Sequence, residues 1–272
     1  MPLLDTTSLR HVDAVLNYLA ADTVHPGVDM QAPSDTPPPP VMNKVTVAIH
    51  DLRDAPRQPS LDDNGFAYLA ATTTTRDFFD HVAVRDVYFA ECAALVAATT
   101  GAHTVHAFDY NLRDKRLARV AHSGVSEPVR FVHNDYTEKS APHRVRDLFP
   151  GGPPGAGRYA FINVWRPIDH AAIDIPLAVC DAASLARADF VPTDLRYAER
   201  TGEVYSARFN PAHRWYYQAG LRPDEALLLK CFDSSQEVPA RYTAHCAFHD
   251  PSAPPDALPR RSIEVRTVAF FD

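Results

Sequence analysis

Short apolar runs of strand length dominate the second half of the chain. They recur, with turn residues between them, at 158–168, 174–181, 202–209, 213–220, 225–234, 241–248 and 261–271. Successive side chains of a strand point to opposite faces, and short runs bounded by Gly, Pro, Asn and Asp are typical of β-strands. This pattern predicts an antiparallel sandwich or barrel.

Helical signals are concentrated upstream. Apolar positions within 9–21 fall on one stripe of a helix. Residues 85–102 predict a helix that ends at Gly101, because glycine tolerates the left-handed geometry of a C-terminal cap. Residues 140–150 are interpreted as a short helix or a loop. The expected fold is therefore mainly β, with helices toward the N-terminus.

The remaining upstream segments are strands and connections. Residues 44–49 and 103–110 alternate as strands, and 62–65 have the composition of a turn. The proline-rich run 31–40 is expected to form a surface arm, because proline lacks the amide donor that regular structure requires. Since no repeat or abrupt change of composition divides the chain, we expect one domain spanning 1–272.

Composition excludes several classes of protein. The chain is 46% hydrophobic with a formal net charge of -7, which favours a globular domain over a nucleic-acid binder. No apolar run approaches the ~20 residues that span a bilayer, and the N-terminus lacks the pattern of a signal peptide. None of the four cysteines forms a C-x-x-C pair. We therefore expect a soluble, cytoplasmic protein without membrane or nucleic-acid partners.

One motif suggests a metal site. His133 and Asp135 are two positions apart behind a short apolar run, so on a strand both side chains share one face. Such a pair is common by chance. With a second histidine from a later strand it would complete the two-histidine, one-carboxylate set that binds Fe(II) and leaves positions open for a co-substrate and oxygen.

The C-terminal region offers the missing parts. His245 lies in a strand-like run, and a loop then leads to a final strand that opens with Arg260 and Ser262. A guanidinium and a hydroxyl on one face suit the distal carboxylate of a dicarboxylate such as 2-oxoglutarate. We therefore predict His133, Asp135 and His245 as metal ligands, with Arg260 and Ser262 binding the co-substrate.

Alternatives stay open for the third metal ligand and for the arginine that binds the co-substrate. His213, which begins a strand-like run, and His249 compete with His245 for the third ligand. Arg266 shares the alternating face of Arg260 and becomes the clamp if the register differs, whereas Arg222 lies in a turn next to proline and lacks a nearby serine.

Residues 162–167 supply a second group of candidates. Asn163 and Trp165 share a strand face and are placed to border the metal pocket. Arg166 opposes them on an ideal strand, unless Pro167 ends the strand and lets its side chain turn. We assign Asn163 and Arg166 to cofactor binding, with core packing or a surface ion pair as the alternative for each.

Several segments together give the chain a family resemblance. It resembles the non-haem iron oxygenase-like family that includes fungal gibberellin desaturase-like proteins and the bacterial cephalosporin 7-alpha-hydroxylase (methoxylation) protein. The matching segments are SLDDNGF (60–66), TGAHTVHAFDYNLR (100–113), VHNDYT (132–137), INVWRPI (162–168), HRWYYQAGLRPDEALLLKCFDS (213–234), HCAFHDP (245–251) and RRSIEVR (260–266).

The resemblance implies a fold and an activity. The expected core is a double-stranded β-helix, or jelly roll, at 126–272 that carries the metal site, with 1–125 as a mixed N-terminal decoration. The implied enzyme is a dioxygenase that uses Fe(II), 2-oxoglutarate and O2 to hydroxylate or desaturate a small molecule, releasing succinate and CO2. The substrate is expected to be a specialised metabolite, and a homodimer stays open.

Rival functions make different demands on the same residues. A zinc-dependent hydrolase or isomerase using these ligands would have no use for Arg260 and Ser262. A non-catalytic jelly-roll binding protein would be expected to carry a defect among the three ligands, and the sequence shows none. A methyltransferase is disfavoured because the only glycine cluster, at 150–157, is interrupted by prolines.

Overall fold

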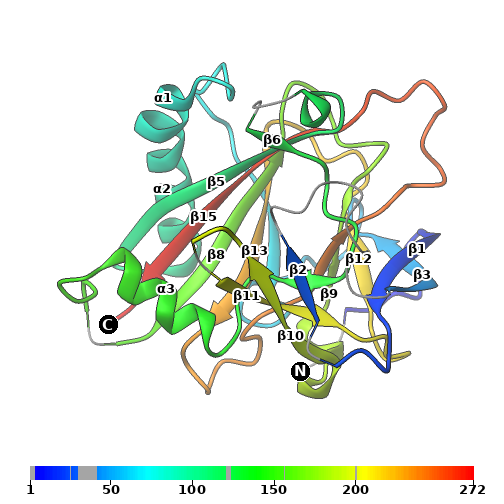
Figure 1. The fold of residues 1–272 in the computed structure, drawn as a ribbon. Helices are drawn as coiled ribbons and strands as arrows, with labels where there is room; N and C mark the ends of the chain where they lie inside the picture. The colour runs from blue at the N-terminus through cyan, green and yellow to red at the C-terminus, as the bar shows by residue number, and fades with distance from the viewer. Residues whose placement is uncertain (1–3, 25, 30–41, 121–123, 156, 200) are drawn as a thin grey trace.

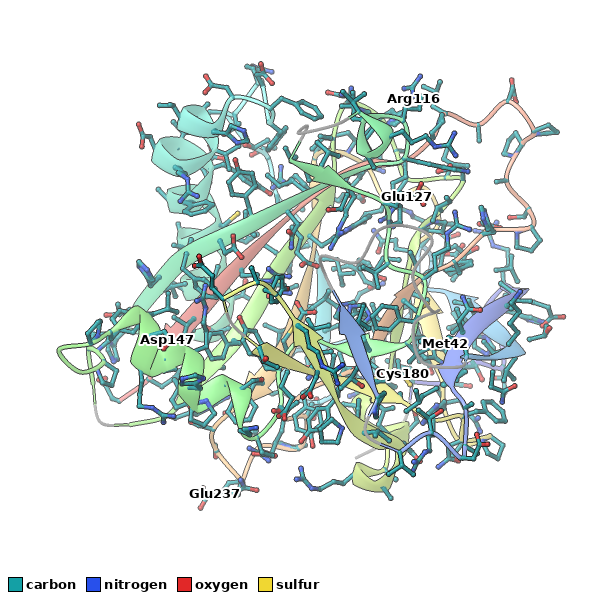
Figure 2. All side chains as sticks on the ribbon, in the orientation of Figure 1. Met42, Arg116, Glu127, Asp147, Cys180 and Glu237 are labelled. Atoms are coloured by element: carbon teal, nitrogen blue, oxygen red, sulfur yellow. The ribbon has the colours of Figure 1, made fainter. Side chains whose placement is uncertain are left out.

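The structure is a computed structural model that describes residues 4–24, 26–29, 42–120, 124–155, 157–199 and 201–272. The surface arm expected at 31–40 lies outside these residues. Most described secondary structure is β, arranged as two sheets, and the side chains fill the space between the ribbons (Figures 1 and 2).

The larger sheet has nine strands in the order β1-β3-β12-β9-β14-β7-β11-β10-β2. In chain order these are β1 (His11–Leu19), β2 (Gly27–Asp29), β3 (Met42–Asp51), β7 (His133–Asn134), β9 (Leu177–Cys180), β10 (Phe190–Arg196), β11 (Thr201–Ala207), β12 (Trp215–Tyr217) and β14 (His245–Ala247). Among its short central strands, β14 is antiparallel to both of its neighbours, β9 and β7.

The smaller sheet has six strands in the order β4-β13-β8-β15-β5-β6. They are β4 (Phe66–Ala70), β5 (Thr104–Asp114), β6 (Val125–Ser126), β8 (Tyr159–Pro167), β13 (Glu225–Asp233) and β15 (Arg261–Phe270). The three central strands β13, β8 and β15 are antiparallel neighbours, and both β8 and β13 are buried along almost their full length.

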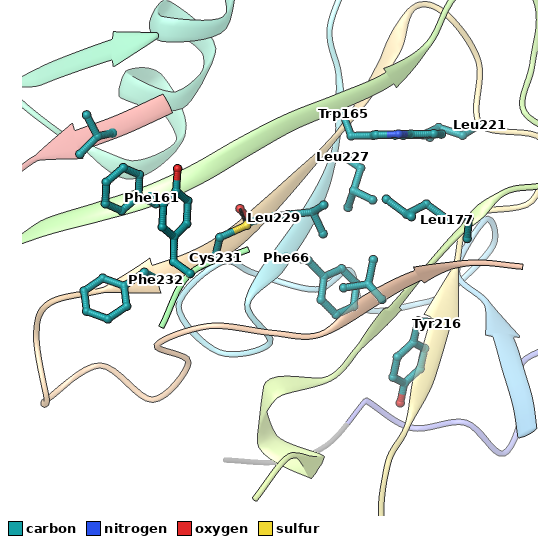
Figure 3. Close-up of a cluster of buried hydrophobic side chains, with 14 of the residues drawn as sticks. Phe66, Phe161, Trp165, Leu177, Tyr216, Leu221, Leu227, Leu229, Cys231 and Phe232 are labelled. Atoms are coloured by element: carbon teal, nitrogen blue, oxygen red, sulfur yellow. Dashed lines mark hydrogen bonds between the residues drawn. The ribbon is translucent and has the colours of Figure 1, made fainter. Parts of the chain in front are cut away.

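The inner face of the smaller sheet packs against the larger sheet. Trp165 of β8 and Leu227 of β13 pack in one buried cluster with Leu177 and Tyr216 from the larger sheet (Figure 3). Because side chains alternate along a strand, the residues between them point outward into a second cluster. Residues one position apart on β8 therefore serve two different cores.

Helices cover the outer face of the smaller sheet. A helical segment runs through α1 (His81–Ala83), a π-helical turn η1 (Val84–Tyr88) and α2 (Phe89–Thr100), beside β5 and β15 in Figure 1. The helix predicted at 85–102 is thus confirmed, with an earlier start. It ends at Gly101, whose φ of 72° is left-handed and whose N–H donates to the Ala97 carbonyl at 2.9 Å.

The other helices are short. They are α3 (Ser140–Leu148), which confirms the helical interpretation of 140–150, and the 3-10 turns η2 (Leu117–Arg119), η3 (Ala182–Ser184) and η4 (Arg187–Asp189). No helix within the described ranges is long and apolar enough to cross a membrane.

The helix predicted at 9–21 is wrong, because these residues form strand β1. Ala14, Leu16 and Tyr18 are buried, whereas the intervening Asp13 and Val15 are exposed, which is the two-residue period of a strand. Pairing with β3 over its whole length fixes β1 in this conformation. The helical stripe depended on Val15, whose side chain faces solvent.

Strands from 1–125 belong to both sheets. β1, β2 and β3 extend the larger sheet, and β4, β5 and β6 flank the smaller one, with β6 beginning at residue 125. The segment 1–125 thus adds strands to the edges of both sheets, and its description as a mixed decoration of a core at 126–272 stays a prediction. The expectation of a single domain stays a prediction.

A buried ion network joins the loop before β4 to the smaller sheet. The fully buried Lys230 ammonium donates to Asp62 at 2.7 Å and lies 3.3 Å from Asp233, which also pairs with Arg158 at 2.6 Å. Asp62, Arg158 and Lys230 border a hollow of about 450 Å³ on the outer face of the sheet, away from the inner-face cluster. Since two cations face two carboxylates, the network is balanced and holds the loop in place.

Gly101 offers a test of the helix cap. Replacing it by alanine should lower the free energy of unfolding by about 1–2 kcal/mol, because a Cβ strains the left-handed backbone while nothing lies within 4 Å to clash with it. Gly101→Asn should cost less, since asparagine tolerates this region. Urea unfolding of both variants measures the difference, and equal costs would contradict a backbone origin.

Candidate metal centre

Two histidines meet at the centre of the larger sheet. His245 at the start of β14 is the register partner of His133 in β7, so both imidazoles project from one face and their ring centroids lie 4.3 Å apart. Both residues are buried. Asp135 follows β7 directly, and the ligand atoms of the three residues all lie within 4.8 Å of one another.

The carboxylate of Asp135 has two different sides. Its Oδ1 lies 3.6 Å from Nε2 of His133 and 3.9 Å from Nε2 of His245. Its Oδ2 accepts a hydrogen bond from Nδ2 of Asn163 at 2.8 Å and lies 3.5 Å from Nε of Arg266. One oxygen thus faces the imidazoles, and the other faces the smaller sheet.

The imidazoles are held neutral. Burial is the main cause that lowers the pKa of His133 to about 4, with a further contribution from His245, and burial also lowers the pKa of His245. Nδ1 of His133 lies 2.8 Å from the Phe131 carbonyl, which only accepts, so this nitrogen donates and Nε2 keeps its lone pair. This is the protonation state of a metal ligand.

The acid is held ionised. Burial raises the pKa of Asp135, whereas the charge of the Arg266 guanidinium and the hydrogen bond from Asn163 lower it, and this pKa lies below its usual value. Two neutral ring nitrogens and one carboxylate oxygen therefore converge without a proton between them. This donor set fits a divalent metal such as Fe(II).

A buried cation lies at the start of β15. Arg260 is 3% exposed, its Nη1 donates to the Ile175 carbonyl at 2.8 Å, and its guanidinium lies 5.4 Å from the Trp165 ring centroid. Burial lowers its pKa to about 9. Among the described residues no carboxylate lies within 4.0 Å of this guanidinium, so its positive charge is buried without forming a salt bridge.

Nearby donors are also unsatisfied. Nε of Arg260 and Oγ of Ser262 are both buried and lack hydrogen-bond partners in the described part of the chain. Unpaired buried polar atoms are costly, and an anionic ligand would satisfy both. The predicted co-substrate residues thus have the free donors that the hypothesis requires.

The alternative residues for the third ligand and for the clamp are bonded to other side chains or exposed. Both ring nitrogens of His213 have protein partners, Tyr18 at 3.1 Å and Asp189 at 3.0 Å, and His249 is exposed. The exposed Arg222 pairs with Asp224 and Glu225.

Arg266 is the neighbour of Asp135 rather than of Arg260. Its Nη1 donates to Asp109 of β5 at 3.0 Å, and Asn163 of β8 is its register partner. The alternating face of 260–266 was predicted, but the contact with the metal-site acid was missed.

The cofactor assignment of Arg166 is corrected. Its side chain points to the outer face of β8, where Nη1 donates to the Pro223 carbonyl at 3.1 Å and the guanidinium lies 5.2 Å from the Tyr88 ring centroid. Asn163, on the inner face, contacts Asp135. The strand continues to Pro167, so strict alternation separates the two side chains.

Sequence reasoning gave no role to two residues near the site, Glu264 and Arg113. Glu264 lies between Ser262 and Arg266 on the same face of β15, and burial followed by the nearby Asp135 raises its pKa. Arg113 of β5 is the register partner of Ser262 and donates to the carbonyl of Glu127, which is labelled in Figure 2. The two-residue spacing from Ser262 and Arg266 places Glu264 on their face of the strand. The position of Arg113 becomes known only from the pairing of β5 with β15.

Comparisons with known proteins agree with this geometry. A family model described as an oxidoreductase/YMDC permease-like domain matches residues 16–270. The Fe(II)/2-oxoglutarate-dependent dioxygenase NvfI of Aspergillus novofumigatus is 33% identical over 82% of this chain and 82% of its own. The hydroxylase/desaturase CTB9 of Cercospora beticola is 32% identical over 84% of this chain and 76% of its own.

A solved structure shows the same fold. The iron and alpha-ketoglutarate-dependent endoperoxidase NvfI superposes with a TM-score of 0.84 at 28% identity, covering 96% of this chain and 98% of that one. The expected jelly-roll core is confirmed.

The fold and the relatives define a non-haem iron oxygenase. The chain belongs to the family of Fe(II)/2-oxoglutarate-dependent dioxygenases and hydroxylase/desaturases that contains these relatives. The predicted enzyme class is confirmed, and the predicted dependence on Fe(II), 2-oxoglutarate and O2 is that of the family.

The buried His213 network yields a stability prediction. His213→Ala should lower the free energy of unfolding by about 3 kcal/mol, because it removes hydrogen bonds to Tyr18 and to the Asp189 carboxylate. His249→Ala, at an exposed position, should stay within about 0.5 kcal/mol of the unsubstituted protein. Urea unfolding tests both, and a silent His213→Ala would contradict the structural role.

Proposed function

We propose that His133, Asp135 and His245 hold Fe(II), and that Arg260 and Ser262 hold the distal carboxylate of 2-oxoglutarate. The enzyme then hydroxylates or desaturates a small molecule, most simply a specialised metabolite, and releases succinate and CO2. The observation that carries the proposal is the convergence of three ligand atoms within 4.8 Å from segments remote in sequence.

Bound iron supplies the oxygen activation that couples decarboxylation of 2-oxoglutarate to oxidation of a C–H bond. The protein positions the metal and leaves room for the co-substrate and oxygen. The three ligands come from one side of the site, the inner face of the larger sheet and the residue after β7, so the opposite side stays available to co-substrate and oxygen. Burial of the two histidines, with the Asp135 side chain only 11% exposed, limits water at the reacting centre.

The co-substrate residues supply an anchor. Arg260 offers a charged donor in a fixed orientation over Trp165, and Ser262 adds a hydroxyl. A hydrolase using the same three ligands has no use for this anchor, which favours the oxygenase over that rival. The partner we propose is therefore a small organic substrate, together with 2-oxoglutarate.

We also propose a cytoplasmic location. All four cysteines are free and buried. Free thiols without disulfides are typical of a reducing compartment.

Metal and co-substrate binding test the ligand set. Anaerobic titration with Fe(II) and 2-oxoglutarate should produce the weak visible charge-transfer band of the chelate. His245→Ala should lose the band, because one of three ligands is missing, and His213→Ala should keep it. Loss of the band with His213→Ala alone would overturn the choice of third ligand.

The anchor has its own test. Arg260→Gln should weaken 2-oxoglutarate binding by about 100-fold, because it removes a buried charge-assisted bond, while Fe(II) binding persists. Arg261→Gln is the matched control, since Arg261 pairs with Asp114 and Asp169 and lies against Phe79. Titration of the chelate band measures both variants, and equal effects would contradict the assignment.

A further inference from the structure

The outer oxygen of Asp135 is held by two side chains from the facing sheet. Asn163 Nδ2 donates to Oδ2 at 2.8 Å, and Arg266 Nε lies 3.5 Å from the same atom. Only Oδ1 faces the two imidazoles. The two oxygens of the Asp135 carboxylate therefore have different surroundings: Oδ1 faces the imidazoles and Oδ2 faces Asn163 and Arg266.

The orientation of Asn163 follows from this contact. The residue is fully buried on the inner face of β8, and its Oδ1 has no partner among the described residues. An ionised carboxylate only accepts, so the amide must present its Nδ2 group to Asp135. The hydrogen bond to Asp135 is thus the one polar contact that the described residues give this side chain.

Arg266 is itself anchored on its far side. Its Nη1 donates to Asp109 at 3.0 Å, and the Asn111 amide, with its oxygen toward the guanidinium, accepts from Nη2 at 2.8 Å. The Glu264 carboxylate lies 3.9 Å from Nη2. These contacts hold a positive charge behind Oδ2, which strengthens the attraction on that oxygen.

We propose that Asn163, supported by Arg266, is a positioning residue that keeps Asp135 a one-oxygen ligand. A carboxylate binds a metal through one oxygen or through both. If Oδ2 turned inward, it would take a coordination position that chelation by 2-oxoglutarate needs. This inference rests on the proposed function and adds to it the contact that keeps a coordination position of the metal free for 2-oxoglutarate.

The test separates metal binding from co-substrate binding. Asn163→Leu removes the donor with little change of volume, and Co(II) replaces Fe(II) because its visible spectrum reports coordination number. Co(II) affinity should change little and the spectrum should shift toward higher coordination. The affinity of the Co(II) form for 2-oxoglutarate should fall about tenfold or more, in the range typical of lost outer-shell contacts.

Asn64→Leu is the matched control. Asn64 is also buried, and its Nδ2 donates to the buried Asp181 at 3.0 Å, outside the metal centre. It should lose stability as Asn163→Leu does, but leave the Co(II) spectrum and 2-oxoglutarate affinity unchanged. Arg266→Gln, at a partly exposed position, should shift both readouts in the same direction as Asn163→Leu and decides the question if that variant does not fold.

Three results overturn the inference. Parallel losses of Co(II) and 2-oxoglutarate affinity would mean that Asn163 supports the site only as structure. Unchanged spectra and affinities in both variants would mean that Oδ2 needs no restraint. Failure of the unsubstituted protein to bind Co(II) would overturn the proposed function as well, and this outcome is recognised before any variant is compared.

Discussion

The pairing of β14 with β7 is the constraint on which the site depends. This register sets His245 opposite His133, and a shift by one residue would turn one imidazole to the other face of the sheet. The flanking strand β9 holds β14 in place from the other side. A backbone ladder, rather than any side-chain contact, thus brings the two nitrogen ligands together.

Burying a carboxylate between two imidazoles is costly unless other groups compensate. The smaller sheet provides them, because Asn163 and Arg266 reach Asp135 from β8 and β15. Arg260 shows the opposite situation, because its guanidinium is buried with no carboxylate of the described residues within 4.0 Å and with an unpaired Nε. The charge of Asp135 is therefore compensated by neighbouring side chains, whereas Nε of Arg260 keeps an unused donor among the described residues.

Much of this arrangement follows from sequence patterns, and the failures have physical causes. Strand alternation predicts that His133 and Asp135 share a face, as do Arg260 and Ser262, and the structure brings His245 to the first pair. The β1 error arose because helical and alternating patterns overlap in a short apolar segment, and only pairing with β3 decides between them. Arg113 and the contact of Arg266 with Asp135 depend on strand register and sheet packing, which no local pattern specifies.

The alternation of β8 between two cores also bears on engineering. Asn163 contacts Asp135 and Trp165 packs against the Arg260 guanidinium, whereas Ile162 and Val164 belong to the helix-covered cluster. Positions that contact the proposed site residues therefore alternate along one strand with positions that pack under the helix. A variant library restricted to Asn163 and Trp165 would change side chains on the inner face of β8 and leave Ile162 and Val164, under the helix, unchanged.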